Sequence, residues 1–392
     1  PYTNTLATIM KKTLLLSILF FSFQIIFSQI NKDIYELNSI DNLLTEKVKK
    51  IIDTNISKKQ TVFLGESVHY SGSDFLAKTE FIKYLVIEHN YKDIVFESDF
   101  FALLFEHDKR NLYTFWSKSN QCEELFKFLE ENNVTIWGFD NKLYSRYSYL
   151  NFTRKLSEIL KEVGIELETE FTRLIKFIIK NQYNSRKELS HKEVEYLKEY
   201  ITELQANEII ENDKVWNQIL KSIESAIKLY TVKDNSSDKN RILIRDKQMA
   251  ENLNFLVKNN PNKKFIVWLA NGHMSKSNSD LMKGQTMGYQ FRKLNPNSSY
   301  HIAIGSIRLP ERTEKDIIKA RKKSNNILSI LPSLKNNYFL DSKKIISENI
   351  ELRNKIFNDM NIFNLPNNKI ELLNHFDVLV FIAYGEEVKY EK

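Results

Sequence analysis

Cysteine is almost absent from the sequence, since Cys122 is the only one among 392 residues. A disulfide within the chain is therefore impossible, and no zinc site of clustered cysteine and histidine ligands can be built from it. The sequence also lacks a basic block and any alternation of basic with aromatic residues, although its formal net charge is +7. Because the lysines are scattered among glutamates, the pattern argues against DNA or RNA binding.

Two groups of enzyme motifs are missing as well. No G-x-S-x-G elbow carries a serine nucleophile, and Cys122 lies in "SNQCEEL", which we expect to enter a helix before the third strand. The stretch "GESVHYSG" has neither the lysine of a Walker phosphate loop nor the glycine spacing of a Rossmann turn. Activation of water is the simplest chemistry that remains.

The N-terminus has the layout of a secretory signal peptide. Met10, Lys11 and Lys12 precede the apolar run "TLLLSILFFSFQIIF", residues 13–27, which is shorter than the roughly 20 residues of a membrane span. We therefore expect a start at Met10, a cleaved signal peptide within residues 1–29, and a secreted or periplasmic mature protein. Since "FSQIN" lacks the small residues of a cleavage site, an uncleaved N-terminal membrane anchor is the alternative.

Residues 30–392 are expected to form a single domain, and with 42% hydrophobic residues overall the chain can bury a large core. A helical pattern beginning near Ser73 or Asp74, either of which is a suitable N-cap, lies between two strand-like runs. This order predicts an α/β fold with a largely parallel central sheet and flanking helices. Short apolar runs predict its strands, which are "TVFL", "DIVFE", "VTIWGFD", "KFIVWLANGH", "YHIAIGSI" and "FDVLVFIAY".

The middle of the chain, about residues 146–240, differs from the rest. It is charged, contains "LIKFIIKNQY" and "HKEVEYLKEYITELQANEII" with helical periodicity, and has no strand-like run. It ends in the polar stretch "KDNSSDKN". The pattern predicts a helical insertion or cap within the α/β domain.

Titratable side chains come directly after four of the predicted strands. In a parallel sheet, sites form beyond the carboxyl ends of the strands, so we expect these groups to meet at one edge. Taken alone, Asp99 and Asp140 are typical of helix caps or turns. The residues after the four runs are Glu66 and His69, then Glu97 and Asp99, then Asp140, and finally Asn271 and His273.

Four of these residues stand out as a chemical set. Glu66, His69, Glu97 and His273 are two carboxylates and two imidazoles, which suit general acid and base catalysis on water. The same side chains are standard ligands of a divalent metal. The residue types leave both arrangements open.

The first of these segments resembles the opening motif of the erythromycin esterase family. That motif has a glycine and glutamate pair, a histidine, an acidic residue before phenylalanine, and a basic residue. In "LGESVHYSGSDFLAK" the matching positions are Gly65, Glu66, His69, Asp74, Phe75 and Lys78.

Later segments resemble further motifs of the family, in the same order along the chain. "IVFESD" is similar to the motif with the catalytic glutamate, here Glu97, and "RDKQMAENLNFL" to the helix that begins with Arg245 and Asp246. "WGFD", "VWLANGHMSK", "TMGYQFRK" and "HFDVLVFI" are similar to its remaining motifs. The resemblance runs from about residue 61 to residue 382.

The resemblance implies an α/β domain whose helical portion caps a cleft, and hydrolysis of a small-molecule ester or lactone. In the best-known members the substrate is a macrolide antibiotic. His69 would be the base that activates water, Glu66 and Glu97 would orient it, and no cofactor would be required. His273 would complete the catalytic set, and the supporting or substrate-binding residues would be Lys78, Asp140, Arg245 and Asn271.

One position departs from the macrolide-cleaving members. They carry a histidine three residues before the position of His273, where this chain has Ala270. Two alternatives to a metal-independent esterase remain, and this departure supports the first of them. One is a binding protein on the same scaffold that holds a small ligand or a metal without turnover, and the other is a metal-dependent hydrolase or peptidase.

Overall fold

The computed structural model describes residues 31–181, 188–231, 238–278, 284–363 and 368–390. The signal segment expected within residues 1–29 lies outside these ranges and stays a prediction. Within the described ranges, no helix is both long and apolar enough to cross a membrane.

The core of the fold is an eight-stranded sheet with strand order β1-β7-β10-β6-β2-β5-β3-β4. The six strands from β10 to β4 pair in parallel, whereas β7 is antiparallel to both of its neighbours. The prediction of a largely parallel α/β sheet is confirmed. The strands are β1 (Ile34–Leu37), β2 (Thr61–Glu66), β3 (Asp93–Asp99), β4 (Thr135–Asp140), β5 (Phe265–Ala270), β6 (Ser299–Arg308), β7 (Asn337–Asp341) and β10 (Val378–Tyr384), beside a separate hairpin of β8 (Phe357–Asp359) and β9 (Asn368–Ile370).

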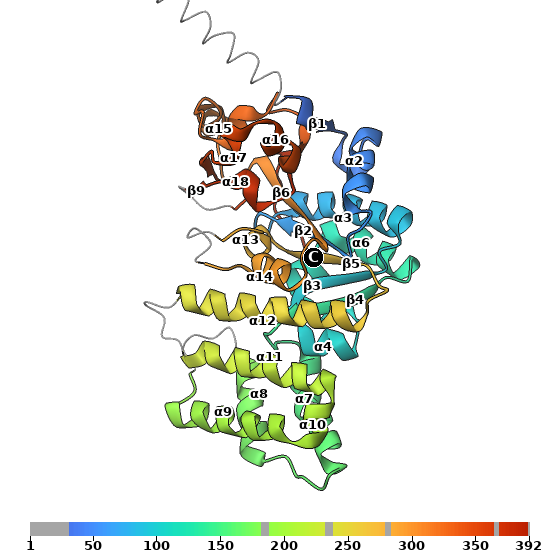
Figure 1. Cartoon of the computed structure of the whole chain (residues 1–392), viewed down its shortest axis with the longest axis vertical. Coiled ribbons are helices and arrows are strands. Elements are labelled where there is room, and N and C mark those ends of the chain that lie inside the picture. The colour runs from blue at the N-terminus through green and yellow to red at the C-terminus, as the bar shows by residue number, and fades with distance from the viewer. Residues whose placement is uncertain (1–30, 182–187, 232–237, 279–283, 364–367, 391–392) are drawn as a thin grey trace, which may run out of the picture.

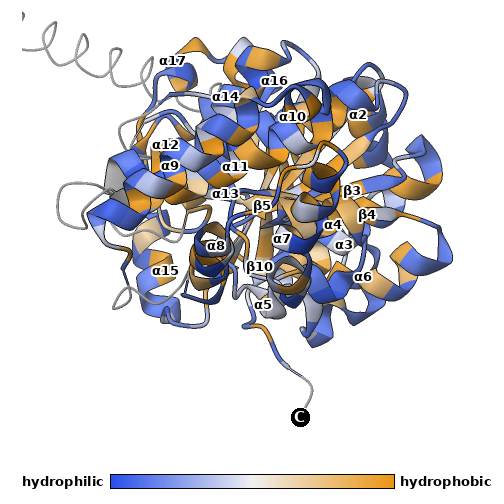
Figure 2. Ribbon diagram, turned by 90° about the horizontal axis from the view of Figure 1, so that it is seen from below, coloured by the Kyte–Doolittle hydropathy of each residue, from blue (hydrophilic) through white to orange (hydrophobic). Residues whose placement is uncertain are grey.

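Successive side chains of the central strands enter two different apolar cores. Val62 and Leu64 of β2 pack on one face of the sheet, and Phe63 between them packs on the other. Helices α2, α3 and α6 cover the first face, and α4, α12 and α14 the second. Figure 2 shows the hydrophobic strands at the centre, with the hydrophilic faces of the helices outside. Burial on both faces explains why the strands read as continuous apolar runs.

The helices outside the insertion, of which α15 to α18 lie toward one end of the long axis, flank this sheet (Figure 1). They are α2 (Glu46–Ile56), α3 (Gly72–His89), α4 (Phe100–Phe105), α5 (Thr114–Ser117), α6 (Asn120–Glu131), α12 (Asp238–Asn259), α13 (Asn271–Met274), α14 (Met287–Leu294), α15 (Glu314–Arg321), α16 (Ser342–Glu348), α17 (Ile350–Arg353) and α18 (Leu372–His375), with one-turn 3₁₀ helices at Asn31–Asp33, Ile40–Asn42, Lys109–Asn111 and Ile327–Ile330.

A block of consecutive helices forms the opposite end of the molecule (Figure 1). Among the described residues between β4 and α12, every regular element is a helix. The block joins the sheet through α12, which packs along β4 and carries Asn252, whose amide donates to the Phe139 carbonyl at 3.1 Å. Its helices are α7 (Arg146–Lys161), α8 (Thr169–Asn181), α9 (His191–Ala206), α10 (Glu208–Asn212) and α11 (Lys214–Thr231).

Helix α3 begins earlier than its sequence predicts. Its N-cap is Ser71, not Ser73 or Asp74. The carboxylate of Asp74 instead reaches back and accepts hydrogen bonds from the backbone N–H and the hydroxyl of Ser67, at 2.8 and 2.7 Å. The side chain therefore shapes the loop between β2 and α3 rather than capping the helix.

Asp99 at the end of β3 is a helix cap, as its position after a strand indicates. One carboxylate oxygen accepts from the Ala102 N–H of α4 at 3.0 Å. The other accepts from the N–H groups of Tyr144 and Ser145, each at 3.0 Å, and from the Ser148 hydroxyl at 2.7 Å. The carboxylate is fully buried, so it joins β3 to the entry of the helical block.

Asp99→Ala should lower the free energy of unfolding by several kcal/mol. A buried donor that loses its partner costs about 1–3 kcal/mol, and this substitution leaves several unpaired. Asp108 offers a matched control because it caps a 3₁₀ helix at the surface, where it bonds Arg110. Asp108→Ala should cost about 1 kcal/mol or less. Equal losses in urea unfolding would show that Asp99 does not join the two parts.

Candidate active site

The predicted site residues lie at or just after the carboxyl ends of four adjacent strands, β2, β5, β3 and β4, except for Lys78 on α3 and Arg245 on α12. Glu66 is the last residue of β2, Glu97 lies near the end of β3, and Asp140 ends β4. His273 lies in the one-turn helix α13 that directly follows β5. Parallel pairing brings these ends to one edge of the sheet.

The Glu66 carboxylate contacts two side chains, His69 and Lys78. Its carboxylate is fully buried, and one oxygen lies 3.0 Å from His69 Nδ1. The other oxygen forms an ion pair with the ammonium of Lys78, which is also fully buried. The ammonium lies 4.1 Å from the ring centroid of Trp268 and donates to the Leu269 carbonyl at 3.3 Å. Burial lowers the pKa of Lys78 well below its ordinary value, and the charge of Glu97 opposes that shift.

His69 is placed to act as a base through its second ring nitrogen. An ionised carboxylate can only accept, so Nδ1 of His69 carries the proton that Glu66 accepts. In the neutral ring, Nε2 then holds the lone pair. About a third of the side chain is exposed, which leaves a path for water. Burial lowers the pKa of His69 below its ordinary value, with Glu97 opposing this shift.

Both oxygens of Glu97 accept hydrogen bonds from the protein, and its charge acts on both His69 and His273. One carboxylate oxygen accepts from Arg245 at 2.6 Å and lies 3.6 Å from His273 Nε2. The other accepts from the Ala270 N–H at 3.1 Å. Burial alone would raise the pKa of Glu97, but His273, Arg245 and His69 outweigh it and hold the pKa well below its usual range. Glu97 is therefore ionised under ordinary conditions.

Arg245 of α12 joins the ends of β3 and β4. Its guanidinium donates to both oxygens of Asp140, at 3.1 and 2.8 Å, and to Glu97. Asp140 also accepts from the hydroxyl of Tyr113 at 3.2 Å. Both carboxylates are buried, and Arg245 and Asp140 are 105 residues apart in the chain. This planar two-point contact is one that arginine, unlike lysine, can make.

His273 belongs to a second histidine and carboxylate pair. Its Nδ1 lies 2.8 Å from Asp246, whose other oxygen accepts from the Met287 N–H at the start of α14. Its Nε2 lies 3.1 Å from an Arg245 nitrogen, so the ring accepts there and donates to Asp246. Burial alone would lower the pKa of His273, but Asp246 and Glu97 outweigh it and raise the pKa.

Comparison with known proteins assigns the chain to a family. The model of the family described as Erythromycin esterase matches residues 87–311, more than half of the chain. The chain belongs to the erythromycin esterase family. The resemblance that the motifs indicated is confirmed, and the matched region includes Glu97, Asp140, Arg245 and His273 but begins after Glu66, His69 and Lys78.

A curated relative is YbfO of Bacillus subtilis (strain 168), which is provisionally named a hydrolase. It is 26% identical over an alignment of 294 residues, and the match covers 63% of this chain and 64% of that protein. The match therefore spans less than two thirds of the relative's length.

Several solved structures share the whole erythromycin esterase-like fold at low identity. A Bacillus cereus protein has a TM-score of 0.74 at 18% identity, covering 94% of this chain and 99% of that one. A succinoglycan biosynthesis protein has a TM-score of 0.72 at 16% identity, covering 94% and 98%. An erythromycin esterase, a mutant of EreC in its open conformation, has a TM-score of 0.68 at 15% identity, covering 90% and 98%.

The ionisable side chains at the strand ends form a cluster, the strand-end cluster, of Glu66, His69, Glu97, Asp140, Arg245 and His273. The side chain of Asn271 points away from this cluster, although its position after β5 placed it among the expected supporting residues. Its amide donates to the carbonyls of Ile304 and Ile362, at 2.8 and 2.7 Å. Its oxygen lies against Gly65, where a Cβ atom would meet it at 2.0 Å. Asn271 therefore fixes α13 against β2 and β6.

Lys142, in the loop after β4, was not expected from the sequence. Burial, with Arg245 acting in the same direction, lowers the pKa of its ammonium to about 8, while Asp140 and Glu97 raise it. It therefore lies within electrostatic reach of the cluster. No apolar periodicity or motif marks this loop, which is why sequence patterns alone do not find it.

The cluster does not resemble a metal centre. Among the residues that the structure describes, no three His, Cys, Asp or Glu side chains are grouped to hold a metal ion. Both oxygens of Glu66 and both of Glu97 already face donors of the protein. A divalent ion would have to displace Lys78 or Arg245, so these residues do not fit a resident metal as they stand.

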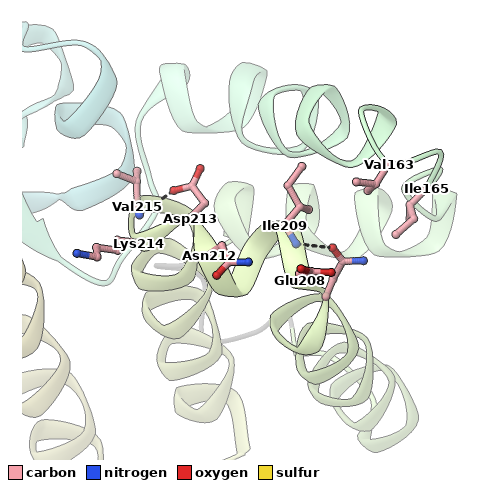
Figure 3. Close-up of a pocket in the computed structure, with 9 residues that line it drawn as sticks. Val163, Ile165, Glu208, Ile209, Asn212, Asp213, Lys214 and Val215 are labelled. Atoms are coloured by element: carbon pink, nitrogen blue, oxygen red, sulfur yellow. Dashed lines mark hydrogen bonds between the residues drawn. The ribbon is translucent and has the colours of Figure 1, made fainter.

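A surface hollow of about 920 Å³ lies far from the cluster, in the helical block. Figure 3 shows it at the turns that join α9, α10 and α11. Asn207 caps α10 by accepting from the Ile209 N–H at 3.1 Å. None of the residues that line it belongs to the strand-end cluster.

Lys78→Met should lower the free energy of unfolding by about 3–5 kcal/mol, because it leaves the Glu66 carboxylate buried without its partner. Lys83→Met on the same helix is the matched control, since Lys83 pairs with Glu80 and the largely exposed Glu124. That loss should be about 1 kcal/mol or less. Similar urea midpoints for the two variants would contradict a buried ion pair.

Proposed function

We propose that the protein hydrolyses a small-molecule ester or lactone by activating water with His69. The observation that carries this proposal is the Glu66 and His69 pair. The buried carboxylate fixes the Nδ1 proton, and the partly exposed ring holds its lone pair on Nε2 beside the Glu97 cluster. Membership of the erythromycin esterase family supports the ester as the scissile group.

The reaction is balanced in protons without a cofactor. His69 Nε2 takes a proton from water as the oxygen attacks the carbonyl carbon, and Glu66 stabilises the imidazolium that forms. When the tetrahedral intermediate collapses, His69 gives this proton to the leaving alkoxide. The positive charges of Arg245 and Lys142 stabilise the negative charge that develops on the carbonyl oxygen.

The proposed substrate is not restricted to macrolides. Ala270 places a methyl group where macrolide-cleaving members are expected to carry a histidine, and its N–H is already bound to Glu97. We therefore propose an ester or lactone hydrolase, with macrolides as one substrate class to be tested beside simple aryl esters.

His69→Asn should lower turnover of any accepted ester about 100-fold or more, because asparagine can still donate to Glu66 but cannot take a proton. The measurement is initial-rate hydrolysis of aryl esters and macrolide lactones by the full chain, with and without EDTA. A rate that survives EDTA and is lost in the variant is the expected result.

His89 provides the control, since it also pairs with a carboxylate, Asp53, at 2.8 Å, but at the far end of α3. His89→Asn should leave the rate unchanged. Turnover lost in EDTA would favour the metal-dependent hydrolase, whereas ligand binding without turnover in the parent protein would favour the binding protein.

The acidic limb of the kcat/KM profile should lie below pH 6.5, the ordinary pKa of histidine. Only neutral His69 is a base, so activity falls as the pH drops through its pKa, which burial lowers. A limb above pH 6.5 would instead assign the titration to His273, whose pKa is raised. The profile is measured under kcat/KM conditions because these report the free enzyme.

A further inference from the structure

Four rings form a continuous, nearly parallel stack that ends at the candidate base. The His69 ring lies 4.9 Å from the Phe115 ring at 20°, and Phe115 lies 5.1 Å from Tyr113 at 14°. Tyr113 lies 4.1 Å from Tyr144 at 9°. The edge of Trp116 meets the His69 ring at 87° and 5.6 Å. His69 is therefore held by aromatic surfaces on two sides.

A hydrogen bond alone does not fix the plane of an imidazole. The contact with Glu66 places Nδ1, but the ring can still turn about that contact, and Nε2 would sweep an arc. A second, face-to-face contact removes this freedom. Aromatic pairs with centroids about 4.5–7 Å apart contribute beyond the area they bury, so the Phe115 face is a physically sufficient restraint.

Phe115 is itself held in place by the core beneath it. It lies in the one-turn helix α5 next to Trp116, which is fully buried against Phe96 of β3 and Trp268 of β5. Its other face is covered by Tyr113, whose hydroxyl donates to Asp140. The face that touches His69 is thus fixed relative to the strand ends that carry Glu97 and Asp140.

We propose that Phe115 is a positioning residue for His69: its ring sets the plane of the imidazole, so that Nε2 points at the attacking water, and its π face stabilises the imidazolium formed during the reaction. The inference rests on the proposed function for its catalytic part. A cation over an aromatic face is stabilised, and more strongly so where water is excluded. Phe115 touches neither water nor substrate in this role.

Charged groups around His69 also act on its protonation. They are Glu66 of β2, Glu97 of β3, Arg245 of α12, His273 of α13 and Lys142 of the loop after β4, and α5, which packs on the ring, contributes none. Phe115→Leu replaces none of these groups and keeps most of the apolar volume that buries His69, so a shift in the His69 titration would report the loss of the ring face.

Phe115→Leu tests the proposal because leucine keeps most of the volume but removes the π face. We expect kcat to fall about 10-fold with KM changed less than about 2-fold, and the acidic limb to move to lower pH. Phe115→Tyr, which restores a ring face, should recover most of kcat. Phe128→Leu on α6 is the control, since Phe128 is a partly buried phenylalanine of the same apolar core, and it should leave both constants unchanged.

The histidine titration gives a readout that does not depend on turnover. His69 is identified in NMR spectra of the full chain as the histidine signal missing from His69→Asn, and its pKa should be lower in Phe115→Leu than in the parent. An unchanged or higher pKa, or a tyrosine variant as slow as the leucine variant, would overturn the positioning role. If the parent turns over no ester yet the pKa falls as expected, the proposed function fails and the stack stands.

Discussion

The site depends on one guanidinium placed among buried carboxylates. Arg245 reaches from α12 to Glu97 of β3 and Asp140 of β4, and it also touches the ring of His273. Two buried carboxylates at adjacent strand ends would repel each other and lose their solvation without it. With Arg245 in place, Glu97 stays ionised, and its charge reaches both histidines.

The two histidines have similar partners but opposite shifts, which separates their roles. Burial lowers the pKa of His69, the positive charges of Arg245 and Lys142 act in the same direction, and Glu97 alone does not outweigh them. His273 faces Asp246 and Glu97 together, so its pKa rises. Groups whose environments push their pKa values apart are typical of sites that use one as a base and another for electrostatic support.

Sequence patterns predict the parts of the molecule that depend on local periodicity. Apolar runs predict the six strands that pair in parallel, which are β2, β3, β4, β5, β6 and β10. The titratable residues that follow these runs include Glu66, His69, Glu97 and His273. The edge strand β1 and its neighbour β7 are four and five residues long, too short to show a period. Lys142 and Phe115 lie in a loop and a one-turn helix, where only tertiary packing decides what a side chain touches. Asn271 lies at the predicted strand end, but its amide is used by backbone carbonyls.

The contact between Arg245 and Asp140 also closes a very long loop, because the whole helical block lies between two residues 105 positions apart. The chain leaves the sheet after β4 and returns on α12 at the same edge. Doubling the length of a closed loop costs only about 0.6 kcal/mol, so the block can grow, shrink or be exchanged while the strand ends keep their chemistry. The long excursion of the chain thus keeps the helical block topologically separate from the strand ends, although α11 contacts the residue after β4 through Ser225 and helix α12 through Ser222.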